Sequence, residues 1–185
     1  CAGVGKTYQM LLEGQRFKED GIDVTVGLVE THGREETKCL LQGLEVVPRR
    51  QIQYRGIEIH EMDLDAIIAR KPAGVLVDEL AHTNVPGSRN AKRYQDVEEI
   101  LAAGIHVIST LNVQHLESLY DTVEQVTGVK VRERIPDRVV VESDQIVNVD
   151  ITTEDLRRRL EEGKVYTTER IETALTHFFK QSNLE

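Results

Sequence analysis

Three short apolar segments constrain the fold of this chain more than any other feature of its sequence. They lie at residues 24–30 (VTVGLVE), 74–80 (GVLVDEL) and 106–112 (HVISTLN). Such nearly continuous apolar runs are typical of strands that are buried on both faces of a parallel sheet. Helical segments separate the three runs. Strands that alternate with helices predict an α/β fold with a mainly parallel sheet and helices on both of its faces.

The remaining sequence predicts several further elements. Helices are expected at 6–20, 34–43, 63–72, 91–103 and 116–128, a hairpin at 51–60, and short strands at 139–143 and 146–150. Two helices are expected to follow these strands. Thr152 and Asp155 form a predicted capping box for the first, and the second has an apolar face over 171–179.

The length and composition of the chain favour one globular domain over residues 1–185. Domains commonly contain about 100–200 residues, and 39% of this chain is apolar. No apolar run approaches the roughly 18 residues of a membrane-spanning helix, so we expect this part not to insert into a membrane. The formal net charge of −9 argues against a nucleic-acid partner, because binding to phosphate backbones requires an excess of lysine and arginine.

The residues GVGKT at 3–7 match the end of the phosphate-binding pattern G-x-x-x-x-G-K-[ST]. The first glycine of that pattern, and the first strand of the sheet, would precede Cys1. Glycines let backbone N–H groups face phosphate oxygens, and the following helix directs its positive end at them. Five residues are therefore expected to hold a nucleotide: Gly3, Val4, Gly5, Lys6 and Thr7. Lys6 would reach the β- and γ-phosphates, and the Thr7 hydroxyl would face Mg²⁺.

A second motif supports the first. The apolar run 74–77 ends in Asp78 and Glu79. P-loop NTPases place an aspartate at such a strand end to hold Mg²⁺, and ligands of open α/β sheets bind at the carboxyl ends of the strands. We expect Asp78 and Thr7 to hold the ion, through water, and Glu79 to activate water. The two motifs predict a P-loop NTPase-like three-layer sandwich that binds ATP and Mg²⁺.

Polar residues also follow the third apolar run. Thr110 and Asn112 lie where a side chain could contact the γ-phosphate or the attacking water, and both are candidate catalytic residues. Ordinary strand termination explains the same two residues almost as well. No N-K-x-D motif follows the later strands, and its absence disfavours a guanine nucleotide.

Longer segments resemble the N-terminal domain of the KdpD family, bacterial sensor histidine kinases that control a high-affinity potassium uptake system. These segments are GVGKTYQML, GVLVDELAHTNVPGSRNAKRYQDVEEIL, HVISTLNVQHLESL and EEGKVY. The resemblance covers essentially the whole chain, and DELAHTN and STLNVQHLESL are far more specific than a phosphate loop alone. FFKQSNL, at 178–184, resembles the point where the family continues into a universal-stress-protein-like module.

The resemblance implies a cytoplasmic regulatory domain of a protein in the bacterial inner membrane. In this family the domain binds ATP and modulates the balance between kinase and phosphatase activity. The expected partners are ATP and the other modules of the same protein, namely the stress-protein-like, transmembrane and kinase modules. No segment here carries a phospho-acceptor histidine on a dimerisation helix, so this chain would at most hydrolyse ATP slowly.

Two other functions fit parts of the sequence. An independent ATPase would use Glu79 as a base and an arginine at the γ-phosphate, for which Arg89, Arg93, Arg134 or a partner's arginine could serve. A helicase-like motor is suggested by DELAH at 78–82, but the acidic charge and the lack of a second motor lobe disfavour it. For a regulatory domain, the polar loop 82–90 is the expected moving part, because it lacks apolar anchors.

Overall fold

The computed structural model describes residues 3–162 and 165. The chain divides into two compact units. The first, the sheet unit, is Thr7–Leu111, and the second, the terminal unit, combines Cys1–Lys6 with Asn112–Glu185. The single domain expected over 1–185 stays a prediction, because such units occur within one domain as well as in separate domains.

A parallel sheet forms the centre of the sheet unit. Its strands are β1 (Val24–Leu28), β2 (Glu45–Val46), β5 (Gly74–Val77) and β6 (His106–Ser109). Their spatial order is β2-β1-β5-β6, and all three neighbouring pairs are parallel. This arrangement confirms the α/β fold with a mainly parallel sheet. The finer assignment to P-loop NTPases stays a prediction.

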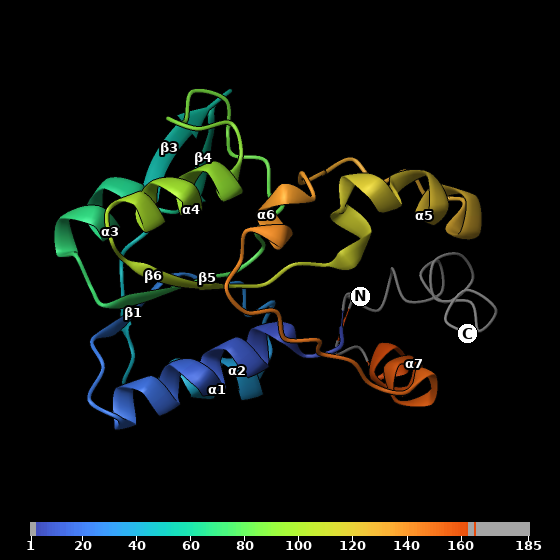
Figure 1. Cartoon of the computed structure of the whole chain (residues 1–185), viewed down its shortest axis with the longest axis horizontal. Coiled ribbons are helices and arrows are strands. Elements are labelled where there is room, and N and C mark those ends of the chain that lie inside the picture. The colour runs from blue at the N-terminus through green and yellow to red at the C-terminus, as the bar shows by residue number, and fades with distance from the viewer. Residues whose placement is uncertain (1–2, 163–164, 166–185) are drawn as a thin grey trace. The chain divides into compact units, whose positions relative to one another are not determined.

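Helices cover both faces of this sheet. α1 (Lys6–Glu19) and α2 (Glu35–Leu41) lie on one face, and α3 (Leu64–Arg70) and α4 (Arg93–Ala102) lie on the other (Figure 1). Each helix overlaps the segment that predicted it. The three layers are compatible with the expected sandwich.

Neighbouring residues of β5 belong to two different cores. Val75 and Val77 pack among the apolar side chains of α3 and α4, whereas Leu76 packs among those of α1. This division follows from the alternation of side chains along a strand. It explains the continuous apolar run, because β5 has no face exposed to water. Close packing extends to Gly27 of β1, where a Cβ atom would lie 2.8 Å from Ile67 Cδ1.

A hairpin stands beside this sheet. Its strands, β3 (Arg50–Tyr54) and β4 (Ile57–Glu61), are antiparallel. Arg55 and Gly56 connect them with φ angles of 51° and 78°. Positive φ at both central residues is typical of the tight turns that suit a two-residue hairpin, so the predicted hairpin is confirmed.

The described part of the terminal unit contains short helices joined by irregular segments. It contains η1 (Val113–His115), η2 (Glu117–Leu119), α5 (Tyr120–Thr127), α6 (Arg138–Val141) and α7 (Thr153–Glu161). Thr152 caps α7 as predicted, because its hydroxyl accepts a hydrogen bond from Asp155 N at 3.1 Å. The helix expected over 171–179 lies outside the described residues. Every described helix is too short or too polar for a membrane span.

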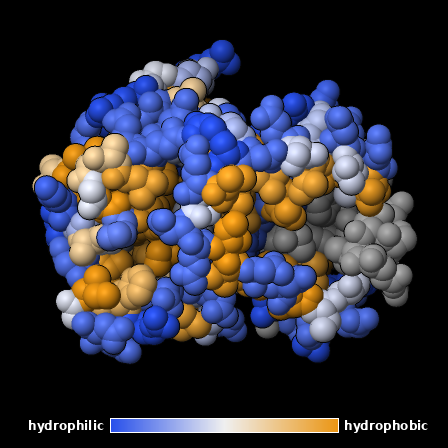
Figure 2. All heavy atoms as spheres, in the orientation of Figure 1, coloured by the Kyte–Doolittle hydropathy of each residue, from blue (hydrophilic) through white to orange (hydrophobic). Residues whose placement is uncertain are grey.

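The two strands predicted near the end of the chain were wrong. Residues 138–141 form the short helix α6, and residues 146–150 have no regular structure. Val141 is 80% exposed and Val147 is 70% exposed. β-branched residues favour strands chiefly where they can pack on a sheet, and no described strand pairs with these segments. Other apolar residues also reach the surface, as the orange patches among hydrophilic residues in Figure 2 show.

Candidate functional site

Asp78 lies directly after β5, is 2% exposed, and accepts hydrogen bonds from several elements. Its Oδ2 accepts from the Thr7 hydroxyl at 2.9 Å and from Glu30 N at 3.3 Å. Its Oδ1 accepts from Glu79 N at 3.1 Å and from the Thr110 hydroxyl. The donors come from α1 and from the ends of β1, β5 and β6. The carboxyl edge of the sheet therefore brings together the predicted residues of the sheet unit.

Thr110 orients the acidic pair. Its hydroxyl donates to Asp78 Oδ1 and accepts from Glu79 N at 3.1 Å, while its carbonyl accepts from Leu80 N at 2.9 Å. One buried threonine thus contacts three successive residues of the neighbouring strand end. This geometry gives Thr110 an orienting role, and its contact with a reacting group stays a prediction.

Glu79 has an unusual backbone conformation. Its φ angle is 57°, in the left-handed region that costs a residue with a side chain about 1–3 kcal/mol. Its carboxylate lies 3.7 Å from His32 Nε2 and 3.8 Å from an Arg93 Nη1 atom. The pairing with His32 lowers the pKa of Glu79, and the same pairing raises the pKa of His32. A general base at Glu79 would therefore be ionised well below neutral pH.

Lys6 and Asn112 lie together in the terminal unit. Lys6 Nζ donates a hydrogen bond to Asn112 Oδ1 at 2.5 Å. This contact joins two predicted site residues that lie far apart in the sequence. The Lys6 ammonium group is held by an amide oxygen, which a phosphate oxygen could replace as acceptor.

The loop before α1 has the backbone that its glycines suggested. Gly3 and Gly5 have φ angles of 86° and 98°, which residues with a side chain rarely adopt. Val4, between them, is buried. Arg159 of α7 donates from Nη1 to the Gly3 carbonyl at 3.2 Å. A Cβ at Gly3 would lie 2.6 Å from Val165 Cγ2, so packing as well as φ requires glycine there.

The residues present fit a magnesium ion carried by a phosphate ligand. Mg²⁺ prefers oxygen ligands, keeps several waters, and is commonly bound through one or two carboxylates together with substrate phosphates. The Thr7 hydroxyl and the Asp78 carboxylate supply oxygens within hydrogen-bond distance of each other. The described residues contain no cluster of three or more His, Cys, Asp or Glu side chains that could cage a metal. A magnesium ion at this site would therefore need further oxygen ligands from the bound phosphate group and from water.

Sequence reasoning missed a buried ionic cluster beside the acidic pair. Glu61, at the end of β4, accepts from Arg93 Nη2 at 3.3 Å and from Val85 N at 3.1 Å, and it lies 3.3 Å from His82 Nε2. Burial raises the pKa of Glu61, but the hydrogen bond to His82 and the charges of His82 and Arg93 outweigh it, so the net pKa is lowered. The alternating sequence of β4 does not distinguish this glutamate from an exposed one.

The arginine candidates of the sequence have specific partners. Arg93 is 3% exposed and is bonded to backbone carbonyls and to Glu61, so it is not an exposed finger. Arg89 pairs with Asp65 and Glu99 at the surface. Arg134 stacks over Tyr120, with 3.4 Å between its guanidinium carbon and the ring centroid.

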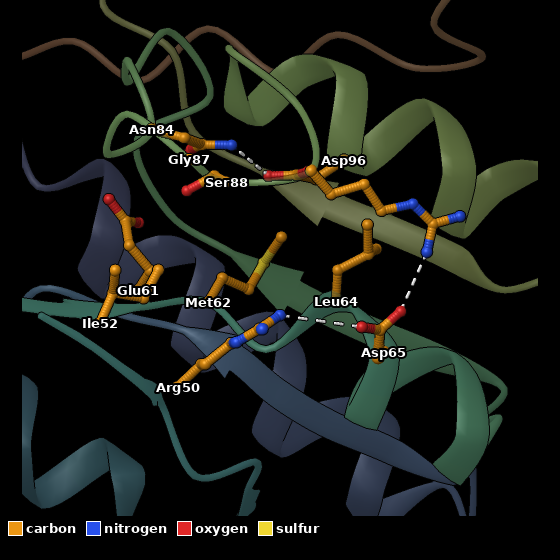
Figure 3. Close-up of a pocket in the computed structure, with 11 residues that line it drawn as sticks. Arg50, Ile52, Glu61, Met62, Leu64, Asp65, Asn84, Gly87, Ser88 and Asp96 are labelled. Carbon is orange, nitrogen blue, oxygen red and sulfur yellow. Dashed lines mark hydrogen bonds and ion pairs between the residues drawn. The ribbon is translucent and has the colours of Figure 1, made fainter.

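A small cavity lies between the hairpin, α3, the loop that precedes α4, and the start of α4 (Figure 3). Its volume is about 100 Å³, and Glu61, Asp65, Asn84 and Asp96 contribute polar groups to its wall. Ligand sites for organic molecules commonly enclose about 300–1,000 Å³. The cavity is therefore too small for a nucleotide, and the sheet edge stays the better candidate.

Comparisons with known proteins agree with the resemblance of the sequence segments. A family model described as "Osmosensitive K+ channel His kinase sensor domain", KdpD, matches residues 1–185. The chain is 56% identical over 184 residues to the Sensor protein KdpD of Escherichia coli and 57% identical over 182 residues to that of Mycobacterium tuberculosis.

These matches cover 100% and 98% of the chain but 21% of each relative. The chain thus spans about a fifth of the length of these relatives. Since the family model spans every residue of the chain, and the relatives are more than half identical to it over the matched residues, the chain belongs to the KdpD family of osmosensitive K+ channel histidine kinase sensor domains.

Proposed function

We propose that this domain binds ATP with Mg²⁺ and thereby regulates a sensor histidine kinase that controls potassium uptake. The observation that carries the proposal is the hydrogen bond between Thr7 and Asp78. Thr7 belongs to the predicted phosphate loop, and Asp78 to the predicted magnesium strand end. Two motifs that were identified independently in the sequence thus meet through the two side chains that would share one ion.

Three further observations support a phosphate ligand. Gly3 and Gly5 have positive φ, as backbone that turns its N–H groups toward an anion often requires. Lys6 begins α1, whose amino-terminal end carries the positive side of the helix dipole. The Thr7 hydroxyl and Asp78 provide the oxygens that Mg²⁺ prefers.

The setting of this domain is part of the proposal. The relatives are named as sensor proteins and are about five times longer, which supports further modules in the same protein. We infer a cytoplasmic domain of an inner-membrane protein, with stress-protein-like, transmembrane and kinase modules as its partners. ATP occupancy would bias the balance of kinase and phosphatase activity in those modules.

An independent ATPase is the second candidate. The position of Glu79 directly after Asp78 favours it, because a carboxylate there could accept a proton from water. However, the Glu79 carboxylate pairs with His32 and Arg93. A carboxylate held by two cationic partners is a weaker base, which favours slow turnover and a regulatory role.

Calorimetric titration with ATP and GTP, each with Mg²⁺ and with EDTA, tests the proposal. The parent protein should bind ATP more tightly with Mg²⁺. Lys6→Ala should weaken ATP binding about 10- to 100-fold, because it removes a charged contact worth about 1.5–3 kcal/mol. Lys18→Ala, on the exposed end of the same helix, is the matched control and should leave affinity unchanged. Equal ATP affinity in Lys6→Ala and parent protein would exclude this site.

A further inference from the structure

The strained backbone of Glu79 must be held by its surroundings. A residue with a side chain stays in the left-handed region only where neighbouring contacts over-determine its position. On one side, Glu79 N donates to Asp78 Oδ1 and to the Thr110 hydroxyl. These bonds hold the amide of Glu79. On the other side, the Glu79 carbonyl accepts from His82 N at 3.0 Å, and Leu80 N donates to the Thr110 carbonyl at 2.9 Å.

Arg93 adds a side-chain donor that reaches the carbonyls on both sides of Glu79. Its Nη1 donates to the Asp78 carbonyl at 3.3 Å and to the Glu79 carbonyl at 3.4 Å. The two carbonyls belong to the peptide groups on either side of the Glu79 Cα. One guanidinium nitrogen therefore contacts both peptides whose rotation would release the left-handed conformation.

Arg93 is itself fixed from three directions. Its Nη2 donates to Glu61 Oε2 at 3.3 Å, and its backbone N donates to the His82 carbonyl at 3.1 Å. It is the first residue of α4, whose Val97 and Ile100 lie in the core of the sheet unit. Burial lowers the pKa of Arg93, whereas Glu61 and Glu79 oppose that shift, and a guanidinium group stays protonated in proteins.

We propose that Arg93 is a positioning residue that holds the backbone of Asp78 and Glu79 in the geometry needed for magnesium. The proposal rests on the proposed function, because it concerns the same ion. Without the two contacts from Nη1, the remaining backbone bonds around Glu79 hold its strained conformation less firmly, and they open more often. When Glu79 N leaves Asp78 Oδ1 and Thr110, the Asp78 carboxylate loses one of its four donors and is aimed less precisely.

Arg93→Lys is the sharpest test of this role. Lysine keeps the positive charge beside Glu61, but its single ammonium group cannot reproduce the planar fork of a guanidinium that contacts two carbonyls and a carboxylate. Arg89→Lys is the matched control. Arg89 lies four residues earlier, is 56% exposed at its side chain, and pairs with Asp65 and Glu99 at the surface.

The first measurement compares ATP binding in Mg²⁺ with binding in EDTA. We expect Arg93→Lys to reduce the magnesium-dependent gain in affinity about tenfold, while affinity in EDTA stays within about twofold of the parent. Arg89→Lys should change neither value. A purely structural role of Arg93 would weaken binding equally in both conditions, and that result, or an unchanged magnesium gain, would overturn the proposal.

The second measurement needs no nucleotide. Hydrogen exchange of Glu79 and Leu80 amides should accelerate about tenfold in Arg93→Lys and stay unchanged in Arg89→Lys. If the parent protein binds no ATP at all, the proposed function fails, and this measurement alone decides whether Arg93 holds the strand end. Unchanged exchange at both amides would overturn that role.

A double variant covers the case in which Arg93→Lys does not fold. Glycine accepts positive φ without strain, so Glu79→Gly removes the strain against which Arg93 is proposed to act. Arg93→Lys combined with Glu79→Gly should then fold. If the double variant fails to fold, Arg93 is needed for packing of the core and not for the backbone of Glu79, and the proposal is overturned.

Discussion

Thr7 and Asp78 lie 71 residues apart in the sequence, and a hydrogen bond of 2.9 Å joins the Thr7 hydroxyl to Asp78 Oδ2. The bond connects the first turn of α1 with the end of β5. The bond brings the hydroxyl oxygen of Thr7 next to a carboxylate oxygen of Asp78. An ion that this pair holds through water would depend on the negative charge of Asp78.

Asp78→Asn should therefore affect binding with metal more than binding without it. We expect the affinity for ATP in Mg²⁺ to fall at least about tenfold, and the affinity in EDTA to change little. The variant should also lose about 1–3 kcal/mol of stability, because its amide NH₂ would face donors where a carboxylate oxygen accepted their bonds. Calorimetry and thermal unfolding measure the two effects.

Asp96→Asn is the matched control for this prediction. Asp96 is also a buried aspartate, and it accepts hydrogen bonds from the side chains of Asn84 and Asn90. Its substitution should lower stability without a selective effect in Mg²⁺. If both variants lose affinity alike in Mg²⁺ and in EDTA, Asp78 has no special relation to the metal.

The sheet was predictable because burial on two faces produces a readable pattern. β1 and β5 lie between other strands, and their apolar runs predicted them. β6 was expected to be equally buried, but Val107 and Ile108 are only partly buried because β6 is the last described strand of the sheet. The segment 139–150 is also rich in valine, yet a strand needs a partner, and composition does not reveal whether one exists.

The candidate site was predictable only where a motif is local. GVGKT and the acidic pair are short patterns, and the structure brings Thr7, Asp78 and Thr110 together. Glu61 was missed, and Arg93 was predicted only as a possible arginine at the γ-phosphate, because their contact joins segments that lie 32 residues apart. Sequence alone shows their charges but neither their burial nor their partners.

The loop 82–90 shows the same limit. Its polar composition predicted mobility, because it has few apolar anchors. In the structure, Asn84 donates to Asp96 and to the Asn90 carbonyl, and Asn90 donates to Asp96 and Glu99. Polar side chains therefore anchor this loop to α4 in place of apolar ones, and its mobility stays a prediction.

The pair formed by His32 and Glu79 predicts a measurable titration. The pairing with Glu79 raises the pKa of His32, and the charges of Arg34 and Glu30 act on that pKa in opposite directions. Glu79→Gln should therefore lower the His32 pKa toward its ordinary value of about 6.5. NMR of the His32 imidazole, recorded from about pH 5 to about pH 9, measures the change in this pKa. Glu58→Gln, which alters a different histidine pair, is the control and should leave the His32 titration unchanged.

The same pair contributes to stability only within a pH window. The raised pKa of His32 means that its contribution is complete below about pH 6.5 and is lost as pH rises through the raised value. The lowered pKa of Glu79 means that its contribution is complete above about pH 4.5 and is lost on acidification. Because both side chains are about half exposed, the effect should be small. A pH-dependent loss in parent protein that persists in His32→Gln would contradict this assignment.

Arg159 predicts an effect on the phosphate loop from a distant helix. Its hydrogen bond to the Gly3 carbonyl helps to fix the loop before a ligand arrives. Arg159→Gln should weaken ATP binding about three- to tenfold, since a loop that is less ordered must be fixed on binding. Arg158→Gln removes a neighbouring exposed arginine that pairs with Asp155, and it should leave affinity unchanged. Calorimetry on both variants checks the prediction, and equal losses would show a general effect of charge.

The last prediction separates occupancy of the site from turnover of ATP. A ligand shifts a conformational equilibrium only by its difference in affinity for the two states, so a regulatory domain needs binding and not hydrolysis. Glu79→Gln keeps the size of the side chain and the contacts of Lys6 and Thr7. In the full-length protein it should leave the potassium-limitation response close to normal. Lys6→Ala should alter the balance of kinase and phosphatase outputs without abolishing autophosphorylation.

A reporter strain grown at limiting potassium, with both variants expressed at equal levels, makes the comparison. Glu79→Gln must be shown to bind ATP like the parent before its output is interpreted. An occupancy sensor then predicts normal output from Glu79→Gln and altered output from Lys6→Ala. If Glu79→Gln binds ATP normally and still disrupts the response as strongly as Lys6→Ala, turnover is required, and the independent ATPase becomes the better account of the pair formed by Asp78 and Glu79.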